Sequence, residues 1–135
     1  MHPTPVQRRR LAAAARRVAQ AAYAPYSKFR VGAAVLAGSG RIYTGCNVEN
    51  ASYGLSICAE RAAVFKAVAA GERTIAALAV RTPTRKPTPP CGACRQVLHE
   101  FGPAMTVICA CRSRGRIETT LDRLLPAAFG RKSLR

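Results

Sequence analysis

Two short cysteine-containing stretches constrain this chain more than any other feature of its sequence. Cys58-Ala59-Glu60 and Pro90-Cys91-Gly92-Ala93-Cys94 supply three thiols, two of them with the C-x-x-C spacing of a metal site. Three thiolates can bind one Zn²⁺ ion and leave its fourth tetrahedral position open, as in a catalytic zinc site. The fold must therefore bring together two segments that are distant in the sequence.

The chain before the first stretch is predicted to form a helix, a β-hairpin and a loop. Residues 6–22 carry an apolar helical stripe opposite a face of arginines: Val6, Leu11, Ala14, Ala15, Val18 and Ala22. This acid-free, arginine-rich start also has the composition of a transit peptide, but a helix is preferred because the core needs a long element here. Residues 31–37 and 41–46 follow as paired strands, and polar residues 47–54 form a loop.

Each cysteine stretch is predicted to begin a helix with its ligands on the buried face. For the helix at 58–70 we expect a stripe of Cys58, Arg61 or Ala62, Phe65 and Val68, and for the helix at 91–101 a stripe of Cys91, Cys94, Leu98 and Phe101. Between them lie a strand at 74–80 and a proline-rich loop at 82–90. Strands at 105–111 and 116–119 then flank a turn too short for a parallel crossover, so they are predicted to be antiparallel, and a helical turn follows at 120–125.

Length and charge limit the remaining possibilities. The 135 residues fit one domain, 1–135, with a basic tail at about 130–135. There are 22 lysines and arginines against six acidic residues, but only four tyrosines and four phenylalanines to stack on bases, so we expect no nucleic-acid partner despite a net charge of +16. No apolar run approaches the ~20 residues that cross a bilayer, so no membrane role is expected. The cysteines and the lack of a secretory signal favour a reducing, cytoplasmic location.

Glu60 is the main argument that the metal site is catalytic. A carboxylate two residues from a ligand can take a proton from zinc-activated water, and a structural site has no use for it. The alternative is a closed four-cysteine site that also uses Cys46, Cys109 or Cys111. Arg61 and Arg95 are predicted to offset the negative charge of three thiolates by donating hydrogen bonds to sulfur; the alternative is that both are ordinary surface arginines.

The chemistry predicted from this set is hydrolytic deamination. Zinc lowers the pKa of its bound water toward about 7, and the resulting hydroxide attacks an amine-bearing carbon. Glu60 would shuttle the proton to a ring nitrogen and assist the departure of ammonia.

The motifs Cys-Ala-Glu-Arg at 58–61 and Pro-Cys-Gly-Ala-Cys-Arg-Gln at 90–96 resemble zinc-dependent nucleobase deaminases, with cysteine replacing histidine as first ligand. From Tyr23 to Phe129 the chain is similar to the small homotetrameric cytidine deaminases. The resemblance implies one Zn²⁺ per subunit, attack at C4 of cytidine or 2′-deoxycytidine, and a role in pyrimidine salvage. With the element order, it predicts an α/β fold, a three-layer α-β-α sandwich whose five-stranded mixed sheet ends in two antiparallel strands.

The same resemblance assigns roles at matching positions. Asn47 and Glu49 would bind the ribose 3′-hydroxyl, Phe29 would pack near the pyrimidine, and the backbone of Ala59 would hold the base with Glu60. Phe129 would stack on the base from an adjacent subunit, and Tyr53 would make inter-subunit contacts, so active sites would be shared within a homotetramer. Taken singly, these residues could instead be turn-forming, core or interface residues.

The sequence is also compatible with three other functions. A polynucleotide or tRNA deaminase would share the zinc motif, although such enzymes usually carry histidine at the position of Cys58. A cytosine-bearing antibiotic could be the substrate, although the Asn47 and Glu49 pair favours a plain nucleoside. A non-catalytic, zinc-stabilised binding module would have no need for Glu60.

Overall fold

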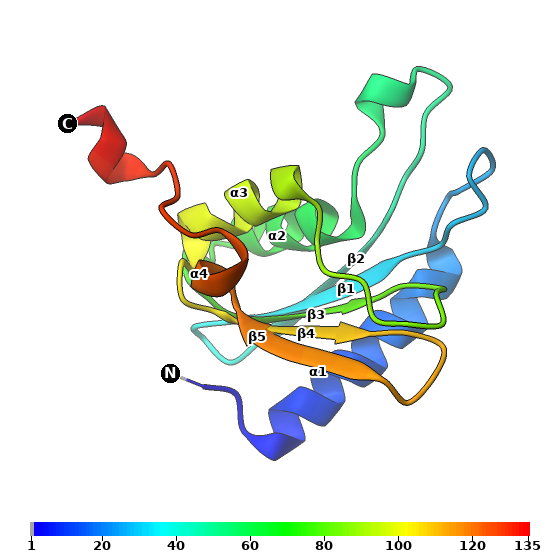
Figure 1. Ribbon diagram of the computed structural model, residues 1–135, viewed down its shortest axis with the longest axis horizontal. Coiled ribbons are helices and arrows are strands. Elements are labelled where there is room, and N and C mark those ends of the chain that lie inside the picture. Colours follow the sequence, from blue (N-terminus) through cyan, green and yellow to red (C-terminus); the bar gives the residue numbers. More distant parts are fainter. Residues whose placement is uncertain (1) are drawn as a thin grey trace.

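The computed structural model describes residues 2–135, which form one five-stranded mixed sheet of order β2-β1-β3-β4-β5 (Figure 1). Strand β1 is antiparallel to both β2 and β3, β3 is parallel to β4, and β4 is antiparallel to β5. The predicted mixed sheet with an antiparallel last pair is therefore confirmed. The strands are β1 Gly32–Ala37, β2 Ile42–Cys46, β3 Ile75–Arg81, β4 Thr106–Ala110 and β5 Arg116–Thr120.

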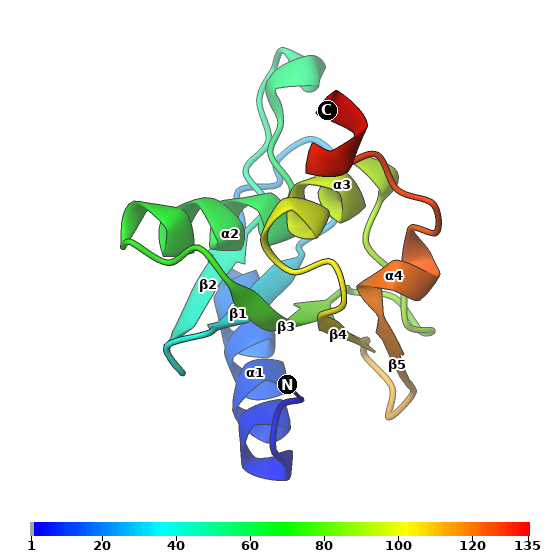
Figure 2. The same cartoon turned by 90° about the vertical axis from the view of Figure 1, so that its left-hand side faces the viewer.

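Helices cover both faces of this sheet. Helix α1 (Pro5–Val18) lies on one face, and helices α2 (Ala59–Ala69) and α3 (Gly92–Phe101) lie on the other (Figures 1 and 2). The predicted three-layer sandwich is confirmed. Short helical segments complete the chain: η1 Ala19–Ala21, η2 Tyr53–Leu55, α4 Leu121–Leu124 and η3 Arg131–Leu134.

Helix α1 packs through a narrower stripe than the sequence predicts. A capping box between Thr4 and Gln7 fixes its start. Leu11 and Ala15 are buried against β1 and β3, whereas Val6 is 54% exposed. The helix lies so close to β1 that a Cβ at Gly32 would be 2.0 Å from the carbonyl oxygen of Ala15.

The central strands are buried on both faces, as the apolar run at 31–37 predicts. In β1, Ala33 and Val35 belong to the core under α2 and α3, while Ala34 and Leu36 belong to the core under α1. The sheet is therefore a rigid platform for the segments that follow its strands.

The buried face of α2 differs from the predicted one. Phe65, predicted to be buried, is 50% exposed, and the residues that face the sheet are Ala59, Glu60, Ala63, Val64 and Ala67. This helix carries apolar residues nearly all round, so its hydrophobic periodicity did not define a face. For α3 the prediction is better, because Cys94 and Leu98 are buried and Phe101 packs against the core. Cys91, also predicted on the buried face, is exposed because it is the N-cap residue before the first turn.

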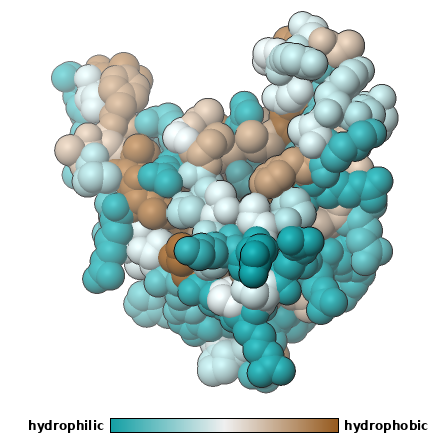
Figure 3. Space-filling view, turned by 45° about the vertical axis from the view of Figure 1, so that its right-hand side comes forward, coloured by the Kyte–Doolittle hydropathy of each residue, from teal (hydrophilic) through white to brown (hydrophobic). Residues whose placement is uncertain are grey.

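Two arms project from the side of the sheet that carries α2 and α3. One is the loop of residues 47–57, which contains η2, and the other is the C-terminal segment that ends in η3 (Figures 1 and 2). The space-filling view shows a hollow between two projecting parts of the surface (Figure 3). Hydrophilic side chains cover much of the face below this hollow. Within residues 2–135, no helix combines the length and apolar character needed to cross a membrane.

Candidate zinc and substrate site

The three candidate zinc ligands lie at the beginnings of two neighbouring helices. Cys58 is the N-cap residue of α2, Cys91 is the N-cap residue of α3, and Cys94 lies in the first turn of α3. The first turns of both helices have backbone N–H groups without helical partners and carry partial positive charge. This environment stabilises thiolates.

The spacing of the sulfurs fits one tetrahedral zinc ion. Cys58 Sγ lies 4.0 Å from Cys91 Sγ, Cys91 Sγ lies 3.4 Å from Cys94 Sγ, and all three lie within 4.8 Å of one another. With Zn–S bonds of about 2.3 Å, tetrahedral ligands are separated by about 3.8 Å. The observed distances bracket that value, so these residues fit the ion that the motif implies.

The closed four-cysteine alternative is not supported by the geometry. Among residues 2–135, no fourth Cys, His, Asp or Glu joins the three-cysteine cluster. Cys109 belongs to the core, and the thiol of Cys111 contacts the backbone oxygen of Arg85, on another part of the molecule. Three protein ligands would leave the fourth position of a tetrahedral zinc ion open, as in catalytic zinc sites.

Arg61 contacts a ligand sulfur, as predicted, whereas Arg95 contacts backbone. Arg61 Nη2 donates a hydrogen bond to Cys58 Sγ at 3.3 Å. Arg95 donates from Nε to the oxygen of Pro90 at 2.7 Å and from Nη1 to that of Leu124 at 2.8 Å. Arg95 thus holds the residue before Cys91 in place, and any effect of its charge on the thiolates acts through space.

The thiols of Cys58 and Cys94 have opposite pKa shifts. The neighbouring Cys94 thiol, followed by the Arg61 guanidinium, lowers the pKa of Cys58 to about 5. The same pairing raises the pKa of Cys94. The surroundings of Cys58 thus favour its thiolate, which is the form that binds a metal ion.

Glu60 is buried beside these sulfurs. It is 4% exposed and lies in the first turn of α2. Burial raises the pKa of its carboxyl group, and the negative charge of Cys58 raises it further. A carboxyl group with a raised pKa can both accept and return a proton near neutral pH.

A cavity of about 240 Å³ connects these groups. Its lining includes four predicted site residues besides two of the cysteines: Phe29, Asn47, Ala59 and Glu60. The rest of the wall consists of residues to which the sequence motifs gave no role: Val31, Val80, Thr82, Thr88, Pro89 and Pro90. The sequence predicts a proline-rich loop at 82–90 without a role in the site, and its position directly before Cys91 is the signal that it borders the cavity.

Asn47 and Glu49 also fasten the chain around this cavity. Asn47 accepts a hydrogen bond from the Val31 amide at 2.9 Å and donates one to the oxygen of Phe29 at 2.7 Å. Glu49 accepts hydrogen bonds from the amides of Tyr26 and Ser27 at 3.0 and 3.1 Å and from the Ser27 hydroxyl. Ser27 is the main reason that the pKa of Glu49 is lowered.

Three other predicted residues do not line the cavity. Its described lining does not include Glu49, Tyr53 or Phe129. Tyr53 is 76% exposed on the 47–57 arm, and Phe129 is 60% exposed on the C-terminal arm. In the single chain, neither aromatic side chain lines the cavity.

Comparisons with known proteins agree on one family. Residues 5–111 match the model for the cytidine and deoxycytidylate deaminase zinc-binding region. The chain is 49% identical over 126 residues to a cytidine deaminase from Sporosarcina psychrophila, covering 93% of each chain. A crystal structure of cytidine deaminase from Burkholderia pseudomallei matches with a TM-score of 0.87 and 49% identity, covering 90% of this chain and 98% of that one. The enzyme from Mycobacterium tuberculosis gives a TM-score of 0.78 at 43% identity, covering 90% of this chain and 96% of that one.

Proposed function

This chain belongs to the cytidine and deoxycytidylate deaminase family. We propose that it removes the amino group of cytidine and 2′-deoxycytidine by hydrolysis. The products are uridine or 2′-deoxyuridine and ammonia, which fits a role in pyrimidine salvage. The observation that carries this proposal is the three-cysteine cluster, two of whose members, Cys58 and Cys91, line one cavity with the buried carboxyl group of Glu60.

The residues of the chain divide the chemical work. Cys58, Cys91 and Cys94 would hold Zn²⁺, which supplies a Lewis acid that makes water nucleophilic near neutral pH. Glu60 takes a proton from water in the cavity as the water oxygen adds to C4 of the pyrimidine, and it delivers that proton to N3. It then assists the transfer of the second water proton to the departing amine. The burial of Glu60 favours its protonated form, which makes it an effective donor in the later steps.

The wall of the cavity would select and orient the nucleoside. We assign Phe29 to packing on the pyrimidine and the backbone of Ala59 to hydrogen bonding with the base. Asn47 and Glu49 would bind the ribose hydroxyl through lone pairs that their backbone contacts leave available. Such contacts would favour a nucleoside over a free base.

The assembly we propose is a homotetramer with one zinc ion per subunit. Exposed Phe129 and Tyr53 on the two arms would complete the sites of neighbouring subunits. Residues 1–135 would act as a single catalytic domain in the cytoplasm. The six cysteines, all free thiols, are compatible with a reducing compartment.

The direct test is ultraviolet monitoring of cytidine conversion to uridine. We expect activity that a zinc chelator removes and that added Zn²⁺ restores. Glu60→Gln should retain zinc, measured by elemental analysis, but lose about 10²–10⁴-fold in rate. Deamination of single-stranded DNA or tRNA without activity on cytidine would contradict the assigned substrate. Absence of ammonia release from every substrate would contradict the enzymatic function.

A further inference from the structure

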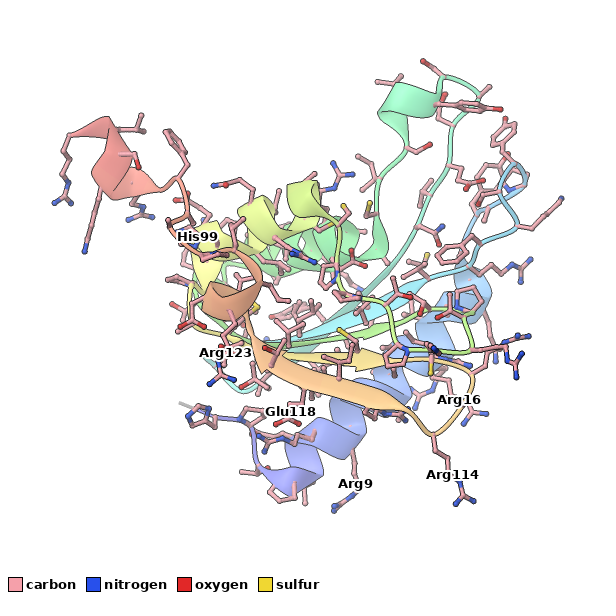
Figure 4. All side chains as sticks on the ribbon, viewed as in Figure 1. Arg9, Arg16, His99, Arg114, Glu118 and Arg123 are labelled. Atoms are coloured by element: carbon pink, nitrogen blue, oxygen red, sulfur yellow. The ribbon has the colours of Figure 1, made fainter. Side chains whose placement is uncertain are left out.

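A second, strongly basic cavity lies on the opposite face of the sheet from the zinc site. It encloses about 540 Å³ between α1, the end of β3 and the β4–β5 turn. Six arginines line it: Arg9, Arg16, Arg81, Arg112, Arg114 and Arg116. Figure 4 shows Arg9 and Arg16 on α1 and Arg114 on the β4–β5 turn, all on the α1 side of the sheet.

These arginines have no carboxylate partners. Within residues 2–135, the ion pairs are Arg8–Glu118 and Arg131–Glu100, and neither uses an arginine of the cavity. Glu118 is the acidic residue that β5 places on this side, and Arg8 holds it at 3.0 Å. Six like charges around one hollow repel each other, and a bound anion would relieve that repulsion.

Arg81 is a partly buried, positively charged residue of the cavity lining. Its Nε atom is buried and has no hydrogen-bond partner among the described residues. Burial, followed by the charge of Arg16, lowers the pKa of Arg81. A buried N–H group without an acceptor is costly, and an anion in the cavity would supply an acceptor for this N–H and an opposite charge for the guanidinium.

The shape and chemistry of the lining indicate which kind of anion fits. Arginines from three separate elements converge on one hollow, which suits several phosphate groups close together. The described lining contains no aromatic side chain for stacking on a base. Single-stranded nucleic acid is bound along grooves that combine positive charge with such aromatic platforms. The described lining therefore offers charged hydrogen-bond donors for phosphate oxygens and no platform on which a base could stack.

We propose that this arginine cavity binds a compact oligophosphate, either inorganic tripolyphosphate or the phosphate chain of a nucleoside triphosphate. The site is separate from the zinc cavity but shares β3 with it. Arg81 lies between Val80 and Thr82, and both of those residues line the zinc cavity. The two cavities are thus back to back at the end of one strand.

Helix α1 offers a matched pair of variants for the test. Arg9 and Arg16 line the cavity, whereas Arg10 and Arg17, one position further along the same helix, are exposed and do not line it in the described structure. Arg9→Gln/Arg16→Gln and Arg10→Gln/Arg17→Gln therefore remove the same charge from the same helix. Unchanged cytidine deamination in both variants shows that the fold is intact.

Isothermal titration calorimetry of the zinc-loaded protein at physiological ionic strength measures binding. The probes are inorganic tripolyphosphate, a nucleoside triphosphate, orthophosphate and a single-stranded RNA oligonucleotide. We expect tripolyphosphate to bind more tightly than orthophosphate, and Arg9→Gln/Arg16→Gln to weaken its binding about tenfold or more, with a change of about twofold or less in the control pair. Tighter binding of the nucleoside triphosphate than of tripolyphosphate identifies a nucleotide as the source of the phosphates; equal or weaker binding identifies the inorganic chain.

Three results would overturn the proposal. An equal loss of binding in both variants would show diffuse attraction to a basic protein. Equal affinity for orthophosphate and tripolyphosphate would remove the requirement for several linked phosphates. Binding of RNA without binding of tripolyphosphate would assign the surface to a nucleic acid instead.

Discussion

At the scale of single residues, the charge around the zinc ligands is the main constraint on catalysis. Three thiolates and one Zn²⁺ ion sum to −1, and the nearby Glu60 can add a further negative charge. Such a site is a weak Lewis acid unless cations offset the excess. Arg61 does this directly through its 3.3 Å hydrogen bond to Cys58 Sγ, whereas Arg95 fixes the backbone before Cys91.

Replacing these two arginines tests that division. Arg61→Ala should lower kcat about 10–100-fold with zinc still bound, because a hydrogen bond to a ligand sulfur is lost. Arg61→Lys keeps the positive charge and should recover part of the rate. Arg95→Ala should lower both activity and thermal stability, since two backbone carbonyls lose their donor. Zinc content, kcat and Tm are the measurements. Wild-type rates in both alanine variants would contradict a role of these two arginines in activity.

The sequence was informative about the ligands and less so about their surroundings. Three cysteines and Glu60 were predicted because their chemistry and spacing are local signals. The hydrogen bonds of Asn47 to Phe29 and Val31 were not predicted, because such partners are fixed only when the chain folds back. For the same reason, Arg95 could be placed near a ligand but not paired with Pro90 and Leu124.

Asn47 is the clearest case of a side chain that supports the cavity wall. Asn47→Ala should destabilise the protein by about 1–3 kcal/mol, because the Val31 amide and the Phe29 carbonyl lose their partner. It should also raise KM for cytidine, since Phe29 lines the cavity. Asn50→Ala is the control: its side chain accepts from the Ser52 amide on an exposed loop, so a change within about 0.5 kcal/mol is expected. Chemical denaturation and steady-state kinetics measure both effects. Equal effects at the two positions would contradict this role.

At the scale of elements, the start of helix α2 positions Cys58 and Glu60, and close packing against β2 positions α2 itself. A Cβ at Gly45 of β2 would be 2.3 Å from the Ala63 amide and 2.7 Å from the Ala59 oxygen. Only glycine permits this approach. The close packing places the first turn of α2, and thus two site residues, directly against the sheet.

Gly45→Ala should therefore disturb stability and the zinc site together. Overpacking of this kind costs about 1–3 kcal/mol, and here the displaced atoms are backbone, which cannot move aside alone. Gly38→Ala is the matched control, because the nearest atom to its Cβ would be Thr74 Cβ at 3.4 Å. Tm and zinc affinity should fall in the first variant and stay near the wild-type values in the second. If the Gly45→Ala protein is destabilised but binds zinc with normal affinity, the metal site does not depend on the close packing of α2 against β2.

The same helix explains why part of the fold could not be predicted. The apolar run of β1 and the short β4–β5 turn carry unambiguous signals, and the structure matches them. In α2, alanines lie on several sides of the helix, so hydrophobicity alone does not define the buried face. The predicted buried face was the one that contains Phe65, which is exposed. The choice of face depends on the contact between Gly45 and Ala63, which links two elements and has no local periodicity.

At the scale of the whole molecule, the two arms leave large aromatic side chains exposed. Tyr53 and Phe129 are 76% and 60% exposed, and both arms project from the side that carries the zinc ligands. Aromatic side chains are enriched at the interfaces that proteins bury against one another. A symmetric assembly would allow an arm of one subunit to reach the cavity of the next.

Mixing two inactive variants tests whether sites are shared. Glu60→Gln removes the proton carrier within a subunit, and Phe129→Ala removes the side chain that we assign to the neighbouring site. In a mixed assembly, a Phe129→Ala subunit keeps Glu60 and can receive Phe129 from a Glu60→Gln neighbour. With random mixing, about one site in four then has both groups, so co-expression should raise kcat well above that of either variant alone. Glu60→Gln co-expressed with a variant altered at a ligand of the same site, Cys94→Ser, should give no such recovery. Activity equal to the average of the two separate variants would show that Phe129 acts within its own subunit or not at all.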